Sequence, residues 1–303
     1  MQLTLNQDIQ MPMIGFGTYL ITNEDAQSVV LEALRAGYRH IDTAEAYGNE
    51  EGVGLAIQAG MQELGLSRET IFVTTKLWPG NDAWGQPVKT YKSTIDSLNQ
   101  SLSTLKLDYV DLYLIHAPLA KVQRMEQWKA LVDLRQMGKV RAIGVSNFST
   151  THIEEIKSAG LPLPDVNQIE LHPWSQKPEL TSYLIDHNIS ISAYSSLVPL
   201  STWRTAPGHD SAKTEAMKQA GDEADAPFKK MAQKYGVSEA QILLRWGLQK
   251  GYAILPKSTN KTRIQQNFDV LSFEMDDADM IAIEKMDRGD GVAWSFGDPT
   301  KVS

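Results

Sequence analysis

The hydrophobic positions of the chain follow a regular alternation. Short runs rich in Val, Ile, Tyr and Phe recur, and each is followed by a longer segment in which apolar residues return every three or four positions. The first pattern is typical of a buried strand and the second of a helix that packs on a sheet. The chain is therefore predicted to contain eight βα units, with strands at 14–20, 38–44, 71–77, 111–117, 140–146, 166–172, 189–195 and 252–258.

Two of the intervening helices show their packing face clearly. One begins after Thr22 and Asp25, which have capping-box spacing, and ends before Gly37, which suits a left-handed C-terminal cap. Its apolar stripe consists of Ala26, Val29, Val30, Ala33 and Leu34. A second stripe consists of Val88, Tyr91, Ile95, Leu98, Leu102 and Leu105. Eight such units in 303 residues favour a closed (β/α)₈ barrel over an open doubly wound sheet, with 1–303 in a single domain.

Two segments interrupt this rhythm. Residues 198–226 are polar, are punctuated by Gly and Pro, and show no clear strand; residues 288–303 are similarly irregular. Long loops inside a compact domain are usually functional or mobile. We therefore expect a substrate loop at 198–226 and a substrate-contacting C-terminal tail at 288–303.

Composition and charge exclude several classes of function. The formal net charge of −8 argues against nucleic acid or an anionic membrane as the main partner. The chain has no Cys, and its six His residues contain no H-E-x-x-H or comparable cluster, so no metal site is predicted. Neither a membrane-spanning apolar run nor a signal peptide is present. We expect a cytoplasmic protein with nothing cleaved, and no nucleic-acid or membrane partner.

Polar side chains gather at the ends of the predicted strands. In a barrel of this type, reactive groups lie where the strands finish and the βα loops begin. Any one such residue is more often structural than functional, since strand-end carboxylates cap helices and lysines reach solvent. The set as a whole is more informative, and it consists of Asp42, Lys76, His116, Ser146, Asn147, Gln168, Glu170, Tyr194, Ser195 and Lys257.

Four residues of this region can act together in one proton transfer. Tyr47 lies one short loop beyond Asp42 and could serve as a proton donor. A phenol gives up its proton readily at neutral pH only if a nearby cation stabilises its anion. Lys76 can supply that charge, and Asp42 can keep Lys76 protonated inside the barrel mouth. His116 can donate a second hydrogen bond to a substrate carbonyl. The set predicts proton delivery to a carbonyl oxygen while a cofactor supplies hydride to carbon.

The motifs of the chain resemble the aldo-keto reductase superfamily over nearly the whole length. They are MPMIGFGTY at 11–19, GYRHIDTAEAYGNEEGVG at 37–54, TTKLW at 74–78, LDYVDLYLIHAP at 107–118, AIGVSNF at 142–148, VNQIELHPW at 166–174, AYSSL at 193–197 and ILPKSTNKTRIQQNF at 254–268. The resemblance implies NADPH-dependent reduction of aldehydes and ketones to alcohols on a (β/α)₈ barrel. It also implies a catalytic tetrad with Tyr47 as the general acid, made of Asp42, Tyr47, Lys76 and His116.

The same resemblance implies a set of cofactor contacts. Ser146, Asn147 and Gln168 match residues that bind the nicotinamide carboxamide, and Tyr194 matches the ring that stacks on the nicotinamide. The pyrophosphate segment contains Ser195 and Leu197, and the positions matching the 2′-phosphate site are Lys257, Ser258, Asn260 and Arg263. A basic cluster that includes Lys261, at a helix start, favours NADPH over NADH on physical grounds also. The remaining predicted cofactor contacts are Asn267 and Gln266, the latter replacing a frequent glutamate near the adenine.

Departures from the family pattern concern the substrate pocket. Tyr19 replaces a frequent tryptophan, and Ala117 stands after His116 where a large aromatic residue is common, so a wider pocket is expected. Trp78, Trp84 and Trp294 are predicted aromatic walls. These features favour a medium-to-large aldehyde or ketone, including keto esters and diketones, as the small-molecule substrate.

The sequence bears differently on two alternatives to this interpretation. The segments GFGTYL and GVGLAI both lack the third glycine of the G-x-G-x-x-G motif, so the sequence argues against a Rossmann dinucleotide site. An NADPH-binding redox sensor or interaction protein on the same barrel, with little turnover, stays open as the second hypothesis. The family likeness leads us to expect a monomer.

Overall fold

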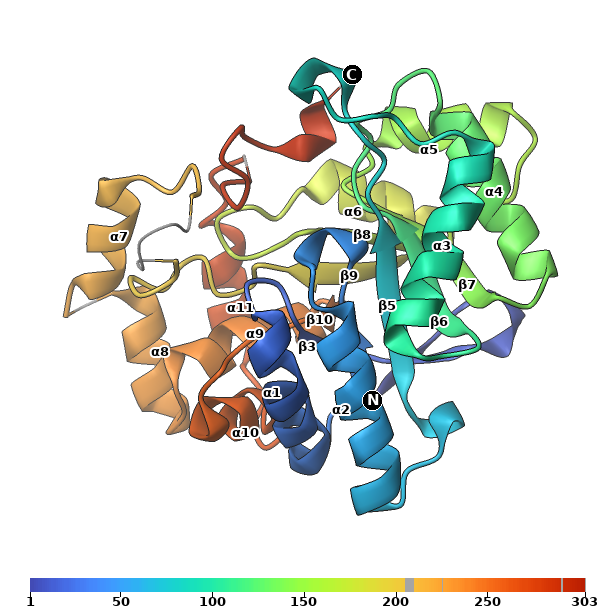
Figure 1. Cartoon of the computed structure of the whole chain (residues 1–303). Helices are drawn as coiled ribbons and strands as arrows, with labels where there is room; N and C mark the ends of the chain where they lie inside the picture. Colours follow the sequence, from blue (N-terminus) through green and yellow to red (C-terminus); the bar gives the residue numbers. More distant parts are fainter. Residues whose placement is uncertain (205–209, 225, 290, 303) are drawn as a thin grey trace.

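The computed structural model describes residues 1–204, 210–224, 226–289 and 291–302. Eight parallel strands follow one another in chain order around a barrel, which confirms the predicted fold (Figure 1). They are β3 (Phe16–Gly17), β4 (His40–Asp42), β5 (Phe72–Leu77), β6 (Val110–Ile115), β7 (Val140–Ser146), β8 (Val166–Glu170), β9 (Ser190–Tyr194) and β10 (Ala253–Ile254). The ring is closed next to β3, where Gly15 N–H donates to Ile254 O at 2.9 Å. All eight predicted strands are present; β7 has the predicted bounds, β5 begins one residue later than expected, and the others end earlier than expected.

Helices cover the outside of the strands (Figure 1). Those described are α1 (Asn23–Ala36), α2 (Glu50–Leu64), α3 (Tyr91–Leu105), α4 (Arg124–Gln136), α5 (Thr150–Ser158), α6 (Pro178–Asp186), α7 (Glu215–Asp222), α8 (Pro227–Tyr235), α9 (Glu239–Gln249), α10 (Lys261–Phe268) and α11 (Asp277–Glu284). As expected, the Thr22 side chain caps α1 by accepting from Asp25 N–H, and Gly37 ends it with φ 111°. In the described part of the chain, no helix has the length and apolar character needed to cross a bilayer.

The two apolar stripes behave as predicted except at one end. All five residues of the α1 stripe are buried against the barrel. In α3, Leu98, Leu102 and Leu105 are buried, whereas Val88 precedes the helix and Tyr91 is exposed. The helix begins at Tyr91 because Thr90 and Ser93 form a capping box there. The predicted apolar stripe therefore starts about one turn before the helix does.

A β-hairpin, which the sequence analysis did not predict, closes the barrel at the amino-terminal ends of its strands. β1 (Gln2–Thr4) pairs antiparallel with β2 (Gln10–Pro12), and the buried Leu5, Ile9 and Met11 belong to the same cluster as Leu112 and Leu114 of β6. These inward β6 residues alternate with Tyr113 and Ile115, which belong to the larger outer core under the helices. The hairpin seals the amino-terminal end, so the open end of the barrel is the carboxyl-terminal one.

The substrate loop and the tail contact each other at that open end. Part of each prediction, at 205–209, 225, 290 and 303, lies outside the described residues. The remainder of the loop includes α7, which lies to one side of the barrel (Figure 1). Ala212 N–H donates to Val292 O at 2.9 Å, and Trp174 shares an apolar cluster with Val198 and Val292. Loop and tail are thus packed together against Trp174.

Candidate active site

The four predicted catalytic residues lie together at the open end of three neighbouring strands. Asp42 is the last residue of β4, Lys76 is in β5, and His116 directly follows β6. These strands pair in the order β4, β5, β6, so their ends meet at one edge of the barrel. Tyr47 ends the 3₁₀ turn Glu45–Tyr47, which Gly48 terminates in the left-handed region with φ 65°. That turn carries the phenol back over Lys76.

The Lys76 ammonium connects Asp42 and Tyr47. Its Nζ lies 2.6 Å from Asp42 Oδ1, 2.8 Å from Thr43 O and 3.3 Å from Tyr47 Oη. Burial lowers the pKa of Lys76, and the charge and hydrogen bond of Asp42 oppose that shift. The ammonium therefore reaches both of its predicted partners, as the proposed chemistry requires.

The electrostatics of Tyr47 differ from the sequence-based expectation. Burial of the hydroxyl, followed by the charge of Asp42 and the neighbouring Tyr19, raises the pKa of Tyr47 well above its ordinary value. The resting phenol is therefore not acidic, because burial makes the largest contribution to its pKa and the charge of Asp42 adds to it. Tyr47 is consequently a fully protonated donor at neutral pH.

His116 is held in its neutral form. Burial and then the Lys76 charge lower the pKa of His116 well below its ordinary value. The imidazole lies edge-on to the Tyr47 ring, with ring centroids 5.5 Å apart. Its buried Nδ1 has no hydrogen-bond partner among the described residues. A neutral imidazole still carries one N–H, so it can donate to a carbonyl beside Tyr47.

The tetrad opens into a cleft of about 1170 Å³. Most of the predicted cofactor residues line it, namely Ser146, Asn147, Gln168, Tyr194, Ser195, Leu197, Lys257, Ser258, Arg263 and Asn267. Asn260 and Gln266 are not among the described residues of its wall: Asn260 caps α10, and Gln266 is exposed on that helix. Lys261 points elsewhere and pairs with Glu32 at 2.8 Å.

The predicted carboxamide-binding residues form a connected polar wall. Asn147, with φ 63°, donates from Nδ2 to Ser146 Oγ at 3.1 Å and to His116 O at 3.0 Å. Tyr194 donates from its hydroxyl to Asn147 Oδ1 at 2.7 Å. Gln168 donates from Nε2 to Asp42 Oδ2 at 2.8 Å. The amides and hydroxyls of this wall are donors and acceptors of the kind that a carboxamide group requires.

Positive charge gathers at the other end of the cleft. Arg263 Nε donates to Ser258 Oγ at 3.3 Å, and Asn260 Oδ1 accepts from Arg263 N–H at 3.0 Å. Burial, then Arg204 and Arg263, lowers the pKa of Lys257. Arg204, which the sequence analysis missed, lies nearer the tetrad: its guanidinium is 5.1 Å from the centroid of the Tyr19 ring, which is itself 5.0 Å from the Tyr47 ring. The mutual repulsion of these cations makes this end a suitable place for phosphate groups.

Trp78 and Trp294 line the cleft beside His116, whereas Trp84 and Phe296 are not among the described residues of its wall and pack against these rings. Trp78 is nearly parallel to Trp294, at 6.4 Å and 11°, and to Trp84, at 6.4 Å and 22°. His116 lies edge-on to Trp78 at 5.5 Å. Phe296, which was not predicted, lies 5.1 Å from both Trp84 and Trp294.

Tyr19 and Ala117, the two predicted pocket residues that depart from the family pattern, lie in different positions relative to the cleft. Tyr19 lines the cleft, with its ring 5.0 Å from that of Tyr47. Ala117 is completely buried and is not among the described residues that line the cleft. The expected widening of the pocket by Ala117 stays a prediction.

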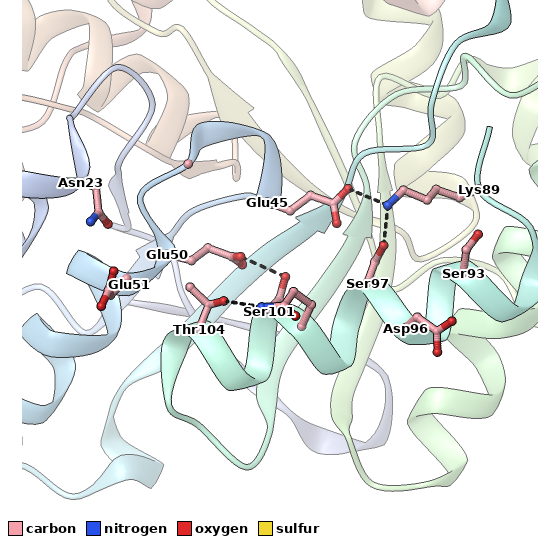
Figure 2. A pocket seen from close by; sticks show the side chains of 12 residues that line it. Asn23, Glu45, Glu50, Glu51, Lys89, Ser93, Asp96, Ser97, Ser101 and Thr104 are labelled. Atoms are coloured by element: carbon pink, nitrogen blue, oxygen red, sulfur yellow. Dashed lines mark hydrogen bonds and ion pairs between the residues drawn. The ribbon is translucent and has the colours of Figure 1, made fainter. Parts of the chain in front are cut away.

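A second pocket of about 620 Å³ lies between α2 and α3 (Figure 2). It contains Glu45, whose carboxylate lies 3.7 Å from Lys89 Nζ, and Glu50, which accepts from Ser101 Oγ at 3.0 Å. Thr75 Oγ1 also donates to Glu50, at 2.7 Å. These carboxylates are satisfied by the protein itself, and none of the predicted catalytic residues faces this pocket.

Comparison with known proteins identifies the class. The model of the Aldo/keto reductase family matches residues 13–288. The chain belongs to this family, as its motifs indicated.

Several relatives and solved structures match nearly end to end. The chain is 37% identical over 298 residues to the 9,11-endoperoxide prostaglandin H2 reductase of Trypanosoma cruzi (strain CL Brener), covering 98% of this chain and 94% of the relative. It is 37% identical over 289 residues to the glyoxal reductase of Bacillus subtilis (strain 168), covering 95% and 93%. An aldo-keto reductase of Bombyx mori, crystallised in complex with NADP, superposes with a TM-score of 0.82 at 33% identity, covering 95% and 93%.

Proposed function

We propose that the protein reduces aldehydes and ketones to alcohols with NADPH, and that Tyr47 donates the proton. The observation that carries this proposal is the Lys76 ammonium, which lies within 3.3 Å of Tyr47 Oη and 2.6 Å of Asp42 Oδ1 at the floor of the cleft. A protonated phenol and a neutral imidazole then face the same space. Two adjacent donors of this kind can hold one carbonyl oxygen.

NADPH, when bound, supplies hydride to the carbonyl carbon. Hydrogen-bonding groups for its carboxamide are present in Ser146, Asn147 and Gln168, which line the cleft beside the tetrad. Lys257 and Arg263 would hold the 2′-phosphate, since a guanidinium and an ammonium together favour a dianion. This fit supports NADPH over NADH.

The chain's own residues then manage the proton. Tyr47 and His116 hydrogen-bond the carbonyl oxygen, which becomes an alkoxide as the carbon is reduced. An alkoxide is far more basic than a phenolate, so the proton passes from Tyr47 even though its pKa is raised. Lys76 stabilises the phenolate left behind, and Asp42 keeps the ammonium charged in its buried site. In alcohol oxidation the same groups act in reverse.

The substrate class follows from the cleft. Aromatic walls on the His116 side favour carbonyl compounds with an apolar or aromatic substituent. Medium-to-large aldehydes and ketones, including diketones and keto esters, fit this description. The glyoxal reductase among the relatives supports the inclusion of dicarbonyl compounds. The monomeric state and the cytoplasmic location stay predictions.

A turnover assay separates this proposal from the sensor hypothesis. The purified protein is incubated with NADPH and a panel of aromatic aldehydes, sugars and keto esters, and both NADPH consumption and alcohol formation are measured. We expect stoichiometric alcohol at a kcat of about 1 s⁻¹ or more for the preferred substrate. Tight NADPH binding with no alcohol from any carbonyl would instead support the sensor.

A further inference from the structure

A buried carboxylate at the end of β8 has no role in the proposed chemistry. Glu170 is completely buried, and its Oε1 lies within hydrogen-bonding distance of His172 Nε2, at 2.9 Å. Burial alone would raise the pKa of Glu170, but hydrogen bonds from His172, Val292 and Ala293 outweigh it and keep that pKa below its ordinary value. Glu170 is therefore ionised at neutral pH, and an ion is retained in a core only where its hydrogen bonds are satisfied.

Two further partners of Glu170 lie more than 120 residues away, in the C-terminal tail. Val292 N–H donates to Oε1 at 2.7 Å, and Ala293 N–H lies 3.0 Å from Oε2 and 3.1 Å from Oε1. Gly291 runs so close that a Cβ there would come within 2.5 Å of Oε2. Charge-assisted bonds of this kind are about twice as strong as neutral ones. The carboxylate thus binds the backbone of Val292 and Ala293 to the barrel, and Gly291 packs closely against it.

The next residue of the tail is part of the substrate pocket. Trp294 lies edge-on to His116, with ring centroids 6.1 Å apart, and nearly parallel to Trp78. Its indole Nε1–H donates to Tyr194 Oη at 2.9 Å. Because a peptide bond joins it to Ala293, the position of its ring depends on where the Ala293 backbone is held.

We propose that Glu170 is a positioning residue that fixes the tail at Val292 and Ala293, so that Trp294 forms a wall of the substrate pocket beside His116. Glu170 is not among the described residues that line the cleft, and it acts through the tail. The substrate part of this proposal rests on the carbonyl reductase function, whereas the attachment of the tail does not.

Glu170→Gln is the direct test. It keeps the size of the side chain but turns an NH₂ group toward N–H groups that require an acceptor. Amide hydrogen exchange at Val292 and Ala293 should accelerate about tenfold or more. Glu179→Gln, the same change at an exposed glutamate of α6, is the matched control and should leave exchange unchanged. Unchanged exchange at both tail amides in Glu170→Gln would overturn the proposal, and this readout needs no turnover.

Kinetics then test whether the effect passes through Trp294. In Glu170→Gln, KM for a bulky aromatic aldehyde such as naphthaldehyde should rise about tenfold, against less than about twofold for methylglyoxal and for the Kd of NADPH. Trp294→Ala should reproduce the naphthaldehyde effect. Adding Glu170→Gln to Trp294→Ala should raise KM by less than about twofold further, because the wall is already gone. Multiplicative effects would contradict the proposal.

A second variant, with its substitution in the tail, keeps the proposal testable if Glu170→Gln does not fold. Ala293→Pro removes one N–H donor to the carboxylate and leaves the barrel interior untouched. It should give the same selective rise in KM for naphthaldehyde, and an unchanged KM would overturn the proposal. If the parent enzyme reduces no carbonyl compound at all, the proposed function fails while the exchange experiment still decides the role of Glu170.

Discussion

Gln168 and Asp42 share a hydrogen bond of 2.8 Å between Nε2 and Oδ2. The other oxygen of Asp42, Oδ1, accepts from Lys76 at 2.6 Å. One carboxylate therefore joins a residue of the proposed nicotinamide site to the residue that supports the proton donor. This arrangement links cofactor placement to the orientation of Asp42.

Replacing Gln168 should therefore affect both binding and chemistry. In Gln168→Leu the Kd of NADPH should rise about tenfold through the lost amide contact, and kcat should also fall several-fold because Asp42 Oδ2 loses its donor. Cofactor titration and saturating kinetics measure the two effects separately. Gln233→Leu, at an exposed position of α8, is the control. A change in Kd with kcat intact would show that the bond to Asp42 has no catalytic importance.

The proton donor can be tested by a pair of matched substitutions. Tyr47→Phe should lower kcat/KM by a factor of about 10²–10⁴ and leave the Kd of NADPH within about twofold. Tyr113→Phe removes a buried hydroxyl that has no hydrogen-bond partner among the described residues, and it should leave both activity and stability nearly unchanged. Retention of most activity by Tyr47→Phe would reject Tyr47 as the acid.

The Lys76–Asp42 pair should show a strong coupling in stability. Lys76→Met leaves Asp42 as a buried charge without its ammonium, and we expect a loss of about 3–5 kcal/mol in the free energy of unfolding. The double variant Asp42→Asn/Lys76→Met removes that charge and should recover most of the loss while remaining inactive. Chemical denaturation measures both variants. An additive loss in the double variant would show that the pair is not coupled.

The regular elements and the tetrad could be predicted because they depend on local pattern and strand order. The run ending in Asp42 has the composition of a strand, and in a parallel barrel neighbouring strand ends must meet. The hairpin formed by β1 and β2 could not be predicted in the same way. Each of its strands has only three residues, too few for a period of two to stand out.

Irregular segments limited the prediction of the site. Arg204 and Phe296 lie in the substrate loop and the tail, where no periodicity indicates which way a side chain points. The expected acidity of Tyr47 failed for a different reason. It rested on Lys76 alone, whereas the final pKa also depends on burial and on the compensating charge of Asp42, which only the three-dimensional arrangement reveals.

A buried histidine should make stability depend on pH. Burial, then the charge of Arg124, lowers the pKa of His152 to about 4. The unfolded chain therefore binds a proton at this residue between pH 6.5 and about 4 while the folded chain does not, so the free energy of unfolding falls as the pH drops through that window. His152→Gln retains a capping-box side chain with Ser149 and should flatten this dependence. Denaturation at several pH values in both proteins would refute the argument if the slopes were equal.

Cofactor preference should depend on Arg263 and not on Lys261. Arg263 lines the cleft and bonds to Ser258, whereas Lys261 is exposed and pairs with Glu32 on α1. Arg263→Leu should therefore raise KM for NADPH about tenfold and leave KM for NADH within about twofold, since only NADPH carries the 2′-phosphate. Lys261→Met, which removes an equal charge that lies outside the cleft and 2.8 Å from the Glu32 carboxylate, should change neither value. Because both residues belong to the first turn of α10, a general field effect would weaken NADPH binding equally in the two variants, and only a direct phosphate contact predicts the difference.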